Sequence, residues 1–207
     1  ISFNDHTVSL VALVSDQIKN GKPVIGFAFN SIGRFGQSGI INERLVDRII
    51  NSDTLLDQEG HFSPALVAGA AMKNEKPGGH GDRAGAVAAI ELAAWDLRAK
   101  MNDEPAYATI AKTLQRDISD ASTSVYAAGG YYYPGDSTEQ LKAELREYLD
   151  QGYTSFKIKI GGVLLNQDMR RIESALEITG KGSALSVDAN GRFDLKQALN
   201  YARAIQP

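Results

Sequence analysis

Two lysines two residues apart are the residues whose types and spacing most directly suggest chemistry. Lys157 and Lys159 lie in an apolar, β-branched run, residues 153–162. In a strand, residues i and i+2 point to the same side, so both ammonium groups share one face while Phe156 and Ile158 face the other. Taken alone, such a pair is typical of a solvent-facing strand whose charges discourage edge pairing.

The segments on either side of the lysines change that interpretation. Helical spacing of apolar residues predicts helices over 138–150 and 166–178, and a further strand is predicted over 184–188. Strands that alternate with helices indicate a parallel sheet, which is normally covered on both faces. A lysine on such a strand points into protein, where an unpaired charge is costly. This cost favours a functional role for Lys157 and Lys159.

An aspartate and an asparagine stand at the carboxyl end of the next predicted strand. In β/α barrels this edge carries the active site, so Asp188 and Asn190 are candidate site residues. An aspartate there is also common in turns and helix caps. Beside two inward lysines, Asp188 is better explained as a ligand of a hard divalent cation, for which Mg²⁺ fits best. Positive charge from Lys157 and the cation would lower the pKa of Lys159, which could then act as a general base.

Length and composition exclude several classes of protein. The chain has 207 residues, 43% hydrophobic and 23% charged, which is enough for one large domain or two small ones. A net charge of −3 without a basic cluster predicts no binding to nucleic acid or membrane. The sequence contains no cysteine, which excludes disulfides, thiolate catalysis and cysteine-based metal sites. No apolar run is long enough to span a bilayer, and we expect a cytoplasmic protein.

The first half of the chain predicts a mixed α+β unit. The expected elements are strands over 8–15 and 24–29, joined through Asn20-Gly21, and helices near 40–50, from Ser63-Pro64 onward and over 84–101. Within the last of these, an alanine-rich helix that we expect to be largely buried, Trp95 and Asp96 are expected to fix packing rather than do chemistry. A boundary is placed near residue 121, where regular strand–helix alternation begins.

A glycine-rich loop precedes the alanine-rich helix. Residues 73–83 lack both the Gly-Lys-Ser/Thr ending of a P-loop and the preceding strand of a dinucleotide fingerprint, which disfavours a nucleotide site. Two alternatives remain for this loop. One is a structural turn with Asp82 near the helix start, and the other is a substrate-covering loop in which Lys76 and His80 meet an anionic ligand.

Several of these segments together resemble a known family. The motifs Ala93-Ala-Trp-Asp-Leu97, Lys157-Ile-Lys159 and Val187-Asp-Ala-Asn190 resemble the enolase superfamily, specifically its mandelate racemase branch. More narrowly, residues 30–39, 74–81, 125–134 and 188–193 are similar to the D-tartrate dehydratases. The resemblance covers essentially the whole chain.

The resemblance implies an α/β fold in two domains. Residues 1–121 would form an α+β capping domain, and residues 122–207 would form the first three βα units of a modified TIM-type (β/α)7β barrel. The family also needs two further acidic metal ligands and a His–Asp pair on later strands, and it begins with a capping strand that is missing here. None of His6, His61 and His80 falls at the catalytic position. We therefore expect a truncated piece of a longer enzyme, inactive and prone to associate in isolation.

The resemblance further implies a magnesium-dependent acid-sugar dehydratase, a lyase. Lys159 would remove the proton α to the substrate carboxylate, Lys157 would lower the pKa of Lys159 and help hold that carboxylate, and Asp188 would be the first Mg²⁺ ligand. Loss of the β-hydroxyl would then give a keto acid, which for D-tartrate is oxaloacetate. The implied substrate-binding residues are Lys76, for the distal carboxylate, with Asn190 and Tyr131 at the strand ends.

Other functions stay open at this stage. A racemase, an epimerase or a dehydratase of a longer acid sugar would share the proton abstraction, and a noncatalytic homologue would bind a ligand without turnover. In each enzymatic case the partner is a small hydroxy dicarboxylate or acid sugar, and a homo-oligomer is expected for the full-length protein. A serine hydrolase is disfavoured by the absence of a Gly-x-Ser-x-Gly motif, and zinc chemistry by the absence of cysteine and of His-Glu-x-x-His.

Overall fold

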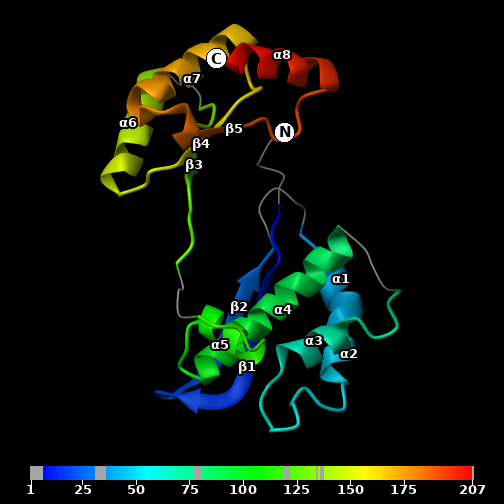
Figure 1. Ribbon diagram of the computed structural model, residues 1–207. Coiled ribbons are helices and arrows are strands. Elements are labelled where there is room, and N and C mark those ends of the chain that lie inside the picture. Colours follow the sequence, from blue (N-terminus) through cyan, green and yellow to red (C-terminus); the bar gives the residue numbers. More distant parts are fainter. Residues whose placement is uncertain are drawn as a thin grey trace. The chain divides into compact units, whose positions relative to one another are not determined.

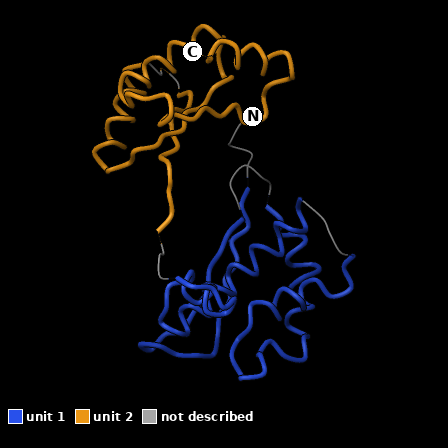
Figure 2. The backbone as a smooth tube through the Cα atoms, viewed as in Figure 1, with its two compact units in different colours: residues 1–121 blue, residues 122–207 orange. Residues whose placement is uncertain are grey.

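The protein is an α/β protein made of two compact units, residues 1–121 and 122–207 (Figure 1, Figure 2). A computed structural model describes residues 7–30, 36–76, 81–118, 122–133, 135 and 138–206. Each unit has a hydrophobic core of its own. Within the described part of the chain, none of the helices is both long and apolar enough to cross a bilayer.

The first unit opens with the predicted β-hairpin. Strands β1 (Leu10–Lys19) and β2 (Lys22–Phe29) pair antiparallel, with Lys19 opposite Lys22 at the turn. Asn20 and Gly21 form this turn at φ values of 50° and 74°, the left-handed region that the pair tolerates. Both strands continue to the turn and are therefore longer on that side than the sequence predicted.

The helices of the first unit follow the hairpin. They are α1 (Ser38–Ile40), a π-helical segment (Ile41–Leu45), α2 (Val46–Ile50), α3 (Pro64–Ala71), α4 (Asp82–Met101) and α5 (Ala106–Thr113). The predicted start of α3 is confirmed, because the Ser63 hydroxyl accepts a hydrogen bond from the Leu66 amide and Pro64 is the first helical residue.

Helix α4 packs directly against β2 (Figure 1). A Cβ atom at Gly26 would lie 2.2 Å from the Ala93 carbonyl oxygen, so this close approach requires glycine. The Asp96 carboxylate accepts a hydrogen bond from the Phe27 amide at 2.7 Å, which confirms its predicted packing role. The predicted burial of α4 holds on one side only, since Leu92 is 54% exposed.

The second unit is a parallel sheet whose strands alternate with helices. Its elements are β3 (Ala127–Gly129), α6 (Thr138–Asp150), β4 (Phe156–Lys159), α7 (Leu165–Thr179), a 3-10 turn (Gly182–Ala184), β5 (Leu185–Asp188) and α8 (Leu195–Ile205). The strand order is β3-β4-β5 and both pairings are parallel, which confirms the predicted alternation. The apolar pattern of the sequence predicts this first strand over 124–128, whereas its pairing with β4 begins only at Ala127, opposite Phe156.

The two faces of β4 differ as the sequence predicted. Phe156 and Ile158 are buried in the core of the second unit, together with residues of α6 and α7. Lys157 and Lys159 face the other way, with 22% and 13% of their side chains exposed. The described residues form three parallel strands, and the (β/α)7β barrel, like the capping role of the first unit, stays a prediction.

Candidate active site

The candidate site gathers around the carboxyl ends of β4 and β5. Parallel pairing sets Lys159 beside Asp188. The Lys159 ammonium donates hydrogen bonds to Asp188 Oδ2 and to Asn190 Oδ1, each at 2.8 Å, while Lys157 Nζ lies 3.6 Å from the same Asp188 oxygen. The fold thus brings four of the residues predicted from sequence into one polar group.

The backbone after β5 holds the two oxygen donors in place. The Asn190 amide donates to Asp188 Oδ1 at 2.8 Å, and Asn190 has a left-handed φ of 50°, followed by Gly191 at 69°. This tight turn leaves the second carboxylate oxygen of Asp188 facing Lys159. The hydrogen bond from Lys159, followed by that from the Asn190 amide, lowers the pKa of the Asp188 carboxyl. Asp188 is therefore an ionised oxygen donor at the sheet edge.

Tyr126 belongs to this group, although the sequence analysis did not single it out. Its hydroxyl accepts a hydrogen bond from Lys157 at 3.2 Å, and the ammonium lies 4.9 Å from the ring centroid. The hydrogen bond to Tyr126 is the main cause that raises the pKa of Lys157, and Asp188 adds to it. Lys157 thus stays cationic, which suits the electrostatic role expected of it.

Tyr131 lies close to the second lysine. Its ring centroid is 5.4 Å from Lys159 Nζ, within cation–π range, and its side chain is 40% exposed. Lys76 is in the first unit, where it is exposed after α3. Its predicted contact with the same substrate therefore stays a prediction. His80 lies outside the described residues.

A buried carboxylate, Asp168, binds the chain segments that follow β3 and β4. Asp168, in the first turn of α7, is fully buried and accepts hydrogen bonds from Tyr132 at 2.5 Å, Tyr201 at 2.8 Å and the Gly161 amide at 2.7 Å. Burial, and then the bond to Asp168, raises the pKa of Tyr132 to about 12. These bonds connect the chain after β3, the chain after β4 and helix α8, so Asp168 fixes the loops that follow β3 and β4.

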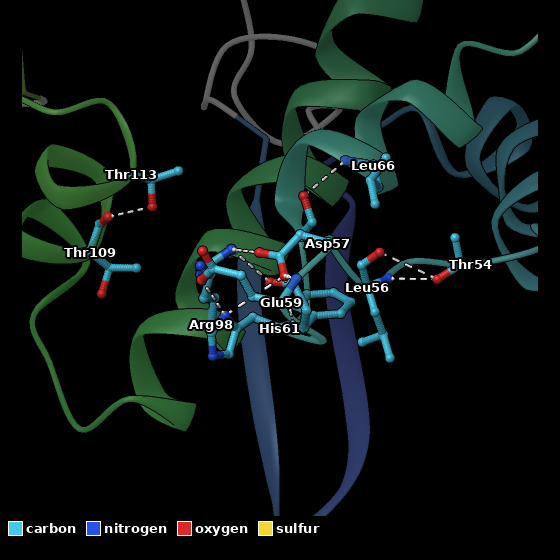
Figure 3. Close-up of polar contacts among 11 residues, drawn as sticks. Thr54, Leu56, Asp57, Glu59, His61, Leu66, Arg98, Thr109 and Thr113 are labelled. Atoms are coloured by element: carbon cyan, nitrogen blue, oxygen red, sulfur yellow. Dashed lines mark hydrogen bonds and ion pairs between the residues drawn. The ribbon is translucent and has the colours of Figure 1, made fainter.

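A separate polar cluster lies in the first unit (Figure 3). Asp57 accepts hydrogen bonds from the backbone amides of Glu59 at 3.0 Å and His61 at 2.9 Å, and Arg98 of α4 lies 3.4 Å from its other oxygen. The His61 amide is the main cause that lowers the pKa of Asp57. Arg98 also donates to the Phe62 carbonyl at 3.1 Å. The cluster ties this turn to α4, and we assign it a structural role.

Comparison with known proteins gives a match to one family model and similarity to several enzymes. Residues 140–207 match the family model described as enolase C-terminal domain-like. The arabinonate dehydratase of Saccharolobus solfataricus is 26% identical over 120 residues, covering 58% of this chain. The L-talarate/galactarate dehydratase of Salmonella typhimurium is 26% identical over 198 residues, covering 95% of this chain.

Solved structures agree with these matches at the level of the fold. A racemase from Streptomyces coelicolor with bound magnesium covers 96% of the chain at 19% identity with a TM-score of 0.63. An enolase from Sargasso Sea environmental sequencing covers 99% at 18% identity with a TM-score of 0.67. The chain is therefore similar to proteins of this kind, by the family model over residues 140–207 and in fold over nearly its whole length. The chain spans 31% and 46% of the length of the two dehydratases, and 55% and 56% of the two structures.

Two oxygen donors of this polar group bear on whether the site suits a metal ion. The Asp188 carboxylate and the Asn190 amide oxygen both approach one point, the Lys159 nitrogen, at 2.8 Å. Oxygen donors of this kind suit Mg²⁺. Across the described residues, three or more His, Cys, Asp or Glu side chains do not cluster in a metal-binding arrangement. The two oxygen donors fit magnesium in kind.

Proposed function

We propose that the full-length protein is a magnesium-dependent dehydratase of hydroxy acids, with D-tartrate as the substrate. The observation that carries this proposal is the position of the Lys159 ammonium, 2.8 Å from both the Asp188 carboxylate and the Asn190 amide oxygen. The Lys159 nitrogen lies beside Asp188, the proposed metal ligand. A substrate carboxylate bound to a metal ion there would lie next to Lys159. Similarity to two acid-sugar dehydratases supports the reaction class.

The proposed first step is removal of the proton on the carbon α to the carboxylate. Lys159, in its neutral amine form, takes this proton, and the electron pair of the broken C–H bond moves into the carboxylate, which then carries two negative charges. Lys157, kept cationic by Tyr126 and Asp188, stabilises that charge. When bound at Asp188, Mg²⁺ would supply further positive charge beside the same oxygens.

The second step expels the β-hydroxyl and leaves an enol. The proton removed from the α-carbon and the hydroxyl lost from the β-carbon together amount to one water. The enol then gains a proton on carbon and becomes the keto acid, so that tartrate yields oxaloacetate. In this scheme Asn190 and Tyr131 bind the substrate near the lysines, and Lys76 binds its distal carboxylate.

Racemisation or epimerisation is the second candidate. The proton abstraction is the same, and the matches include the S. coelicolor racemase and an L-Ala-D/L-Glu epimerase from Bacillus subtilis. The two outcomes differ only after the first step. A racemase returns a proton to the opposite face of the α-carbon and loses no hydroxyl.

A substrate panel in D₂O separates these possibilities. The full-length protein would be incubated with Mg²⁺ and, in turn, with D-, L- and meso-tartrate and with galactarate, and the products followed by NMR. The proposal expects oxaloacetate from D-tartrate, no turnover in EDTA, and recovery on adding Mg²⁺. Deuterated stereoisomers without a keto acid would instead identify a racemase or epimerase. Turnover of galactarate alone would favour a longer acid sugar, and no reaction with any of them a noncatalytic protein.

A further inference from the structure

The outer face of the β1–β2 hairpin, the face turned away from α4, carries a continuous set of apolar side chains. Four cross-strand pairs point to this face, and the pairing is irregular only between Val14 and Ile18. Five of the eight residues are large and between 47% and 70% exposed. All four pairs are apolar: Leu10 with Phe29, Ala12 with Phe27, Val14 with Ile25, and Ile18 with Pro23.

The inner face of the same hairpin is already covered. Val11 is buried there, and Leu13 and Ala28 pack against the core of the first unit. Helix α4 lies against this side, with Gly26 close to Ala93 (Figure 1). An antiparallel sheet with one solvated face normally alternates apolar and polar residues, so that the outward ones are polar. This hairpin departs from that rule, because its outward residues are apolar too.

The hairpin is also fixed along one edge. The Asp96 carboxylate accepts from the Phe27 amide at 2.7 Å, and the Lys100 ammonium donates to the Ile25 carbonyl at 3.1 Å. These backbone groups belong to the edge of β2, and both side chains come from α4. Helix α4 thus holds the hairpin by a face and by an edge, so the outer face is a preformed surface.

The area of this outer face suits an interface. Its five large side chains together expose on the order of 500 Å². Monomeric proteins rarely expose contiguous apolar patches of more than a few hundred Å², and larger ones mark interaction sites. A stable interface buries about 800 Å² on each partner, with an apolar centre and a polar rim. The outer face would supply the apolar centre of such an interface.

We propose that the outer face of the hairpin binds the same face of a second copy of the chain, with the two hairpins antiparallel. Sheet faces pack on one another with their strands nearly aligned, and a contact between identical faces closes as a two-fold dimer. Leu10 of one copy then meets Ile18 of the other, and Ala12 meets Val14. A parallel arrangement would instead bring the two turns together, each with an exposed Lys22. The proposal does not depend on the proposed function.

Sedimentation of the full-length protein over a hundredfold range of concentration tests this proposal. The unsubstituted protein should associate, and Val14→Lys should raise the dissociation constant of the contact about a hundredfold, because each copy would bury an unpaired charge. Phe29→Lys should act in the same direction, and it keeps the test decisive if Val14→Lys folds poorly. Leu92→Lys is the matched control, since Leu92 is 54% exposed on α4 of the same unit. It should leave the dissociation constant unchanged.

Two double variants test the direction of the strands. Leu10→Lys with Ile18→Glu places opposite charges across the antiparallel contact, whereas Leu10→Lys with Ile18→Lys places like charges there. The dissociation constant of the first should be about tenfold lower than that of the second. Equal dissociation constants would overturn the antiparallel arrangement.

Three results would overturn the proposed contact itself. A full-length protein that stays monomeric at every concentration would mean that another part of the same chain covers the face, or that nothing does. An assembly whose dissociation constant is unchanged in Val14→Lys and Phe29→Lys would have its interface elsewhere. A loss of association in Leu92→Lys as large as that in Val14→Lys would mean that any added charge in this unit has the effect.

Discussion

Two clusters in this protein each gather positive charge around one carboxylate, and they differ in the kind of cation. In the first unit Glu75 is surrounded by three arginines, Arg44, Arg48 and Arg83, and is 7% exposed. In the second unit Asp188 meets two lysines and is 31% exposed. Arginine stays protonated and holds geometry, whereas lysine is a compact ammonium that can lose its proton in a suitable environment.

The two clusters differ in what their cations can do: the arginines hold a carboxylate in place, and the lysines can take part in a reaction. In the arginine cluster, arginines of three helical segments bind a carboxylate in the turn that follows α3, and that carboxylate is 7% exposed. At the sheet edge the Lys159 ammonium lies between the Asp188 carboxylate and the Asn190 amide oxygen, at the ends of two strands. We therefore expect substitutions at the lysine cluster to affect chemistry, and substitutions at the arginine cluster to affect stability.

The largest effect is expected from Lys159→Ala. Loss of the general base should lower kcat about a thousandfold, within the usual range for such groups. Lys142→Ala is the matched control, because Lys142 is in the same unit and pairs with Glu177 at 2.6 Å, away from the candidate site. A steady-state assay of D-tartrate dehydration measures kcat for both variants. A thousandfold loss in Lys142→Ala as well would mean that the effect is not specific to Lys159.

Next in size is the effect of Asp188→Asn on the need for metal. Neutralising this ligand should raise the Mg²⁺ concentration for half-maximal activity by about tenfold or more, which corresponds to about 1.4 kcal/mol. Asp194→Asn serves as control: Asp194 caps α8 by accepting from the Gln197 amide at 2.7 Å, and asparagine caps equally well. A magnesium titration that is identical for both variants would remove Asp188 from the metal site.

Asp168 is a third carboxylate to compare, and tyrosine hydroxyls surround it. Asp168→Ala leaves the Tyr132 and Tyr201 hydroxyls and the Gly161 amide without their acceptor. It should lower the free energy of unfolding by about 3 kcal/mol, and Tyr201→Phe, which removes one of the bonds, by about 1 kcal/mol. Urea unfolding measures both. Equal, small losses would mean that Asp168 is replaceable.

The smallest effect expected is the pH dependence of the arginine cluster. The pKa of Glu75 is lowered from 4.5 to about 2, so its ion pairs contribute stability that is complete above about pH 4.5. That stability is lost as the pH falls toward 2, because the carboxylate must then be protonated. The difference in unfolding free energy between the unsubstituted protein and Glu75→Gln should shrink over this range. A difference that stays constant from pH 6 to pH 2.5 would contradict the ion-pair account.

Local periodicity predicted the part of the site that lies on neighbouring strands. Lys157 and Lys159 could be assigned to one face because strand side chains alternate, and Asp188 could be placed at the strand end because parallel strands share one edge. Their meeting is confirmed, at 2.8 Å for Lys159 and Asp188. A different local signal, the tolerance of Asn-Gly for positive φ, predicted the hairpin turn at Asn20-Gly21, which is confirmed.

Other contacts between residues distant in the sequence were outside the reach of such patterns. Tyr126 is 31 residues from Lys157 and meets it only because β3 pairs with β4. In sequence Asp168 looks like an ordinary acidic residue in the first turn of a helix. Glu75 gives no local signal either, since its three arginines come from separate helical segments. One sequence signal could have suggested Tyr126. It lies two residues before Ala128, the residue that pairs with Lys157 in the sheet.

The central claim is that Lys159 removes the α-proton of a hydroxy acid, and solvent exchange tests it most directly. The unsubstituted full-length protein, Lys159→Ala and Lys142→Ala would be incubated with D-tartrate and Mg²⁺ in D₂O, and deuterium in the residual substrate and the product measured by NMR and mass spectrometry. We expect dehydration, and whatever exchange of the α-proton accompanies it, in the unsubstituted protein and in Lys142→Ala. We expect neither in Lys159→Ala. Exchange or dehydration that continues undiminished without Lys159 would contradict the account.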